Sequence, residues 1–186
     1  METLVMVNKN WNDAIKEIVN TIYVRSVHTQ LSTPEELFRF MKLRLDTSLE
    51  FFSNDWLSEN SGLAKDTQLW YFLANHSINI LNKIGSSISE EQVTDILIRK
   101  HSDYGPENIL KFGQTGIIVR MYDKMSRLEN LLKNSKHNFN TAMSANIVQD
   151  ESIIDTLTDI VGYSAIGIMY STYDDDNQRV FDYPMK

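Results

Sequence analysis

Helix-breaking residues are scarce in this sequence, and that scarcity limits the folds open to it. Only three prolines and seven glycines occur among its 186 residues. Apolar residues recur every three or four positions over long stretches, which is the period of an amphipathic helix. We therefore predict an all-α fold, a helical bundle of about six helices.

Local signals place the ends of several of these helices. Two segments have the form of N-terminal capping boxes, Thr33-Pro34-Glu35-Glu36 and Ser89-Glu90-Glu91-Gln92. Gly85 is a plausible helix stop. Glycines and a proline break the pattern in 101–116, which we predict to be a loop, and 135–149 reads as a polar connection. The helices are expected at about 11–28, 33–52, 66–84, 89–101, 116–134 and 150–172.

Composition excludes some classes of function. The net charge is −7 and there is no cysteine, which argues against a nucleic-acid partner and excludes disulfides, thiolate zinc sites and a cysteine nucleophile. The longest uncharged run near the C-terminus, 160–173, is shorter than a membrane span needs, and the N-terminus has no signal-like pattern. We expect a cytoplasmic protein with no membrane partner.

One predicted helix carries a stripe of charge beside its apolar face. Arg120, Asp123, Lys124 and Arg127 fall at i, i+3, i+4 and i+7, so they share one side of the helix. They can pair with one another as a solvated surface stripe. They can also form a wall that binds phosphate.

The last predicted helix carries acids among apolar residues. Glu151, Asp155 and Asp159 are spaced four apart, so their side chains are neighbours. Carboxylates on adjacent turns can share Mg²⁺, which prefers oxygen ligands. Favourable interaction with the helix dipole explains Glu151 but not Asp159, which lies too far into the helix.

The segment "HSDYG" supplies three further candidates. His101 could be a general base or a cation at a helix C-terminus. Asp103 could be a metal ligand or a turn former. Tyr104 could stack on a base or pack on the core. With the two stripes they contain what a nucleotide-phosphate site requires.

These blocks, in this order, resemble the nucleotide modification associated domain 1 family of phages and bacteria. That family is related to the all-α NTP pyrophosphohydrolases of the MazG and dimeric dUTPase type. The resemblance covers about residues 92–172. It rests on Asp103-Tyr104-Gly105, Arg120, Asp123-Lys124, Arg127, Asp155, Asp159 and Tyr163.

The resemblance implies a homo-oligomeric, Mg²⁺-dependent nucleotide pyrophosphohydrolase, with Mn²⁺ as an alternative metal, in a bacterial cytoplasm or that of a phage host. The chain would be one domain, with a pyrophosphohydrolase-like core at 89–172 and 1–88 as a helical extension or cap. The implied metal ligands are Asp155, Asp159, Glu151 and Asp123. The implied catalytic residues are Asp155, Asp159, Lys124 and His101, and the implied substrate contacts are Arg120, Arg127, Tyr104, Asp103 and Tyr163.

The acidic pattern departs from that of the MazG enzymes, which have an E-x-x-E block on one helix and an E-x-x-D block on the next. Position 152 is Ser, Glu151 stands one residue early, and the preceding helix offers only Asp123 and Glu129. A site with fewer acids and more basic residues suits binding without cleavage. The alternative is therefore a non-hydrolytic nucleotide-binding or accessory protein, and a third reading is a structural helical oligomer.

Overall fold

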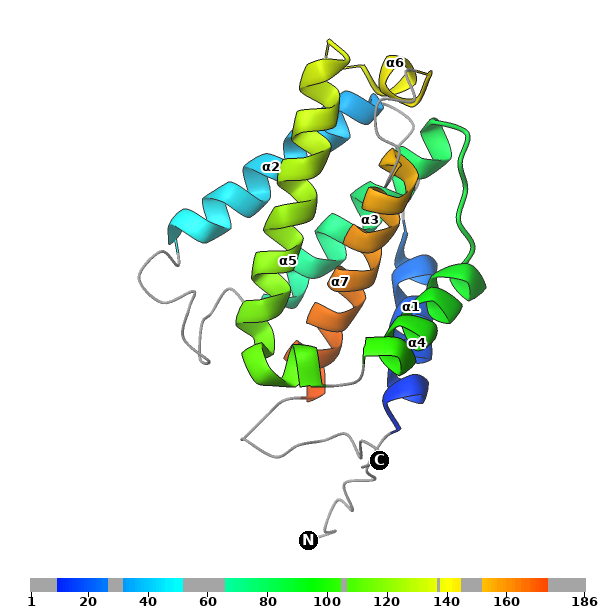
Figure 1. Ribbon diagram of the computed structural model, residues 1–186, viewed down its shortest axis with the longest axis vertical. Coiled ribbons are helices and arrows are strands. Elements are labelled where there is room, and N and C mark those ends of the chain that lie inside the picture. Colours follow the sequence, from blue (N-terminus) through cyan, green and yellow to red (C-terminus); the bar gives the residue numbers. More distant parts are fainter. Residues whose placement is uncertain are drawn as a thin grey trace, which may run out of the picture.

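The computed structural model describes residues 10–26, 32–51, 66–104, 107–136, 138–144 and 152–173. Every regular element in these ranges is a helix, which confirms the predicted all-α fold (Figure 1). The helices are α1 (Trp11–Arg25), α2 (Pro34–Phe51), α3 (Thr67–Lys83), α4 (Glu90–Tyr104), α5 (Glu107–Asn134), α6 (Phe139–Ser144) and α7 (Ile153–Tyr173).

Helix α7 is the centre of the bundle. In Figure 1 it runs down the middle of the view, with α5 on one side and α1 and α4 on the other, and it packs against α1, α3, α4 and α5. Only Asp155 and Asp159 are charged along its length, and a helix that is apolar on nearly all sides must be buried. By length and composition the segment Ile153–Thr172 could cross a membrane, but 78% of its most apolar window is buried inside the bundle.

The most extensive helix contact joins α7 to α3. Trp70 of α3 is almost fully buried and lies flat against the α7 backbone at Gly167. A Cβ atom on Gly167 would stand 2.6 Å from Trp70 Cδ2. Helices from the first 88 residues therefore share one hydrophobic core with the C-terminal helices.

The predicted capping signals are confirmed. The backbone N–H of Thr33 donates to Glu36 and that of Glu36 to the Thr33 hydroxyl, and Ser89 and Gln92 exchange the same two bonds. Gly85 has φ of +76°, and Ser86 N–H donates to the Leu81 carbonyl, so α3 ends in a Schellman motif. These signals could be read because each depends on residues close in sequence.

Two predicted connections contain helix instead. The segment 101–116, expected as a loop, is the end of α4 and the first turns of α5, with only 105 and 106 lacking a described backbone. Glycine within a helix costs only about 1 kcal/mol, so Gly113 and Gly116 do not stop α5. The connection 135–149 contains α6, where the fully buried Phe139 packs edge-on against Phe38 of α2.

Candidate functional site

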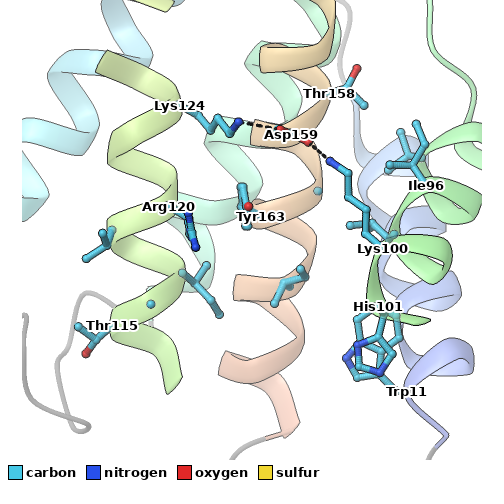
Figure 2. A pocket seen from close by; sticks show the side chains of 17 residues that line it. Trp11, Ile96, Lys100, His101, Thr115, Arg120, Lys124, Thr158, Asp159 and Tyr163 are labelled. Carbon is cyan, nitrogen blue, oxygen red and sulfur yellow. Dashed lines mark hydrogen bonds and ion pairs between the residues drawn. The ribbon is translucent and has the colours of Figure 1, made fainter. Parts of the chain in front are cut away.

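A cavity of about 730 Å³ lies between α4, α5 and α7, with Trp11 of α1 at one end (Figure 2). Its walls are mostly apolar, and its charged groups come from facing helices. The lining residues are Trp11, Val93, Ile96, Leu97, Lys100, His101, Thr115, Gly116, Ile117, Val119, Arg120, Lys124, Thr158, Asp159, Gly162, Tyr163 and Ile166.

Asp159 is the acidic group of the cavity, and it is held by two lysines. Lys100 Nζ of α4 donates to Asp159 Oδ1 at 2.5 Å, and Lys124 Nζ of α5 pairs with Oδ2 at 2.9 Å. Burial raises the pKa of Asp159, but the two ammonium groups outweigh it and leave the pKa below its ordinary value of 3.8. The carboxylate is therefore ionised at neutral pH and bridges all three helices.

Two further polar side chains face this ion cluster. Arg120 extends from α5 toward Tyr163 of α7 (Figure 2), and within the described ranges no ion pair joins it to an acid. Burial raises the pKa of the Tyr163 hydroxyl and Asp159 raises it further, although Arg120 and the two lysines oppose this. Tyr163 therefore remains a hydrogen-bond donor at neutral pH.

Stacked aromatic rings form another part of the wall. The rings of Trp11 and His101 lie 3.8 Å apart with an interplanar angle of 5°, below the ion cluster in Figure 2. Burial lowers the pKa of His101 from its ordinary value of 6.5, so the imidazole is neutral at pH 7. The pair gives the cavity an uncharged aromatic section.

Asp155 lies outside the cavity and caps its own helix. Its carboxylate accepts hydrogen bonds from the backbone N–H of Ser152 at 3.0 Å and from the Ser152 hydroxyl at 2.8 Å. The Ser152 hydroxyl in turn accepts from the N–H of Asp155 at 3.1 Å. This reciprocal pair is a capping box, a local explanation that the sequence interpretation of Asp155 as a metal ligand did not consider.

Three of the remaining candidates do not join the site. Asp103 and Asp123 are exposed, Arg127 is half-buried, and none of the three lines the cavity. Glu151 and the side chain of Tyr104 lie outside what the structure describes. The structure thus brings together five predicted residues: His101, Arg120, Lys124, Asp159 and Tyr163.

The described residues do not fit the expected magnesium site. Among them, no three His, Asp or Glu side chains lie close enough together to hold a metal ion. Asp155 is engaged in its cap, and both oxygens of Asp159 face lysine ammonium groups. We therefore derive no step through a metal.

Lys100 and Trp11 are the site residues that sequence reasoning did not find. Lys100 comes from α4, where it is an exposed helical lysine like many others, and only the packing of α4 on α7 brings it to Asp159. Gly162 marks this approach, because a Cβ atom there would stand 3.0 Å from Leu97 of α4. A glycine inside an apolar helix was the available signal.

No family model, curated protein or solved structure matches this chain.

Proposed function

We propose that this protein binds a small phosphorylated molecule with a flat apolar body, of which nucleotides are the leading class, and that binding does not depend on hydrolysis. The observation that carries the proposal is the convergence of Lys100, Lys124 and Arg120 on one end of a largely apolar cavity. Cations beside a flat, apolar wall match the two chemical halves of a nucleotide.

The charge of the cavity favours an anion. Lys100, Arg120 and Lys124 contribute three positive charges and Asp159 one negative charge, so the described residues of the lining carry two positive charges, whereas the whole chain carries −7. A positive cleft with low-dielectric walls focuses the electric field and attracts anions. The net negative charge of the whole chain discourages binding to extended polyanions such as DNA.

The apolar part of the cavity suits an aromatic ring system. Its volume of about 730 Å³ falls within the range of roughly 300–1,000 Å³ typical of small-molecule sites. The stacked Trp11 and His101 rings and the aliphatic side chains of α4 and α5 offer burial to a base. Thr115 and Thr158 add hydroxyl groups to the lining.

Calorimetric titration with AMP, GMP, CMP and UMP and their triphosphates, in EDTA and in Mg²⁺, tests the proposal. We expect at least one nucleotide to bind in EDTA. Lys100→Ala or Arg120→Ala should weaken that binding about tenfold, because each removes a charge-assisted contact. Arg99→Ala is the matched control, since Arg99 is exposed on the same helix and does not line the cavity.

Two results would redirect the proposal. If none of these nucleotides binds, the cavity serves another ligand. If chromatography of the mixtures shows a monophosphate and pyrophosphate formed only with Mg²⁺, the protein is the hydrolase that the sequence resemblance implies.

A further inference from the structure

Two cations of the cavity converge on one carboxylate. Lys100 and Lys124 come from different helices and hold opposite oxygens of the same carboxylate, at 2.5 and 2.9 Å. Arg120 reaches toward Tyr163 one helical turn further along α7 (Figure 2). A site for an extended polyphosphate would spread its cations along the chain of phosphates, whereas the two lysines meet at one carboxylate, a position suited to a single phosphate group.

The exposure of the two lysine side chains differs. The Lys100 side chain is 45% exposed and that of Lys124 only 14%. An entering anion can therefore draw Lys100 away from Asp159 while Lys124 continues to neutralise the carboxylate. Asp159 thus acts as a resident anion, and it sets how much positive charge remains for a ligand.

We infer that the site selects a phosphomonoester dianion, such as a nucleoside monophosphate, and that Asp159 determines this preference by fixing the net charge of the cavity. This inference rests on the proposed function and names the ligand class of the same site. Two positive charges in the lining match the two negative charges of a terminal phosphate. A triphosphate brings more negative charge than the lining can balance, and the described residues offer no acids for a metal that would balance the rest.

The electrostatic energy of a ligand in the cavity scales with the product of the two charges. The preference for a dianion over a monoanion of similar structure therefore depends on the charge of the lining. That charge is two in the natural protein, becomes one in Lys100→Ala or Arg120→Ala, and becomes three in Asp159→Asn. The dianion preference should follow the same order.

A titration with matched ligands tests this order. We would take the tightest-binding 5′-monophosphate among AMP, GMP, CMP and UMP, and its 3′,5′-cyclic counterpart, which has the same base and sugar but one negative charge fewer. At pH 8 the phosphomonoester is fully dianionic and His101, whose pKa lies below 6.5, is neutral. Differences in ligand shape are common to all variants and cancel when the ratio of the two dissociation constants is compared between them.

We expect the ratio to favour the monophosphate in the natural protein, to fall about tenfold in Lys100→Ala and in Arg120→Ala, and to rise about tenfold in Asp159→Asn. Arg99→Ala should leave it unchanged. A triphosphate in EDTA should bind no more tightly than the monophosphate. If Asp159→Asn does not fold, the ratios of the two dissociation constants in Lys100→Ala and Arg120→Ala still test the inference.

The outcomes separate the two proposals. Nucleotide binding with a ratio that is the same in every variant, or with a tighter triphosphate, would overturn the dianion inference and leave the proposed function standing. Failure of every nucleotide to bind would overturn both.

Discussion

At the scale of single residues, Gly167 leaves no room for a side chain. Trp70 lies against the α7 backbone there, and a Cβ atom would stand 2.6 and 2.7 Å from two atoms of its indole ring. Glycine is kept in the middle of α7 although alanine would favour the helix by about 1 kcal/mol. Close packing of α3 on α7 therefore outweighs helix propensity at this residue.

We predict that Gly167→Ala lowers the free energy of unfolding by about 1–3 kcal/mol, because overpacking a rigid ring displaces it. Urea denaturation measures the change. Trp70→Phe in the same chain provides the control: the smaller ring should recover part of the loss, as a positive coupling energy. A Gly167→Ala protein as stable as the natural one would show that α3 and α7 are not in such close contact.

Tyr23 links α1 to the residues at the start of α4, and its ionisation reports on that contact. Its hydroxyl donates to the Ile88 carbonyl at 2.8 Å, and burial, together with the nearby Glu90, raises its pKa from 10.0 to about 12. The folded state therefore holds the phenol proton more tightly than the unfolded state. The resulting stability is present in full below pH 10 and is lost as pH rises toward 12.

We predict that the natural protein loses stability more steeply between pH 10 and 12 than the Tyr23→Phe variant, which has no phenol to ionise. Denaturation curves across this range measure the difference, and ionisation of other groups is common to both proteins. If the free energy of unfolding changes with pH in the same way in both proteins, the raised pKa of Tyr23 is contradicted.

At the scale of secondary structure, Asp155 belongs to the start of α7. The reciprocal bonds between Ser152 and Asp155 satisfy N–H groups that the first turn leaves open. We predict that Ser152→Ala lowers the free energy of unfolding by about 1 kcal/mol. Asp155→Asn should cost about 0.5 kcal/mol through weaker capping and loss of a favourable charge–dipole interaction.

Both variants should bind nucleotide as the natural protein does, because neither residue lines the cavity. Asp95→Asn, at an exposed position within α4, controls for the loss of a surface carboxylate. Loss of nucleotide binding or turnover in Asp155→Asn alone would favour Asp155 as a functional ligand.

The helix ends that depend on residues close in sequence could be predicted. The helix ends that depend on a balance between small free energies could not. The capping boxes at Thr33 and Ser89 and the stop at Gly85 each need only a few adjacent residues. The start of α5 at Glu107 was missed, since the modest cost of glycine in a helix was treated as decisive. Helix α6 was missed because Phe139 is buried by α2, a contact far away in sequence.

At the scale of the whole molecule, the cavity residues that share one helix could be predicted, whereas those that meet through the packing of different helices could not. Periodicity correctly grouped Arg120 with Lys124 on one face of α5, and both line the cavity. It also placed Asp155 beside Asp159, but the bundle turns Asp159 toward the lysines and leaves Asp155 in its cap. Lys100 could not be foreseen, because its contact joins residues 59 positions apart.

We propose that Asp159 competes with a ligand anion for Lys100 and Lys124. The Asp159→Asn variant tests it most directly, with its fold checked by circular dichroism. Calorimetric titration of AMP, GMP, CMP and UMP into this variant and the natural protein, both in EDTA, compares the two affinities. We predict about tenfold tighter binding by the variant, because the negative charge at position 159 is gone and Lys100 loses its carboxylate partner. Weaker binding by a folded variant, or binding by the natural protein that appears only with Mg²⁺, would contradict the account.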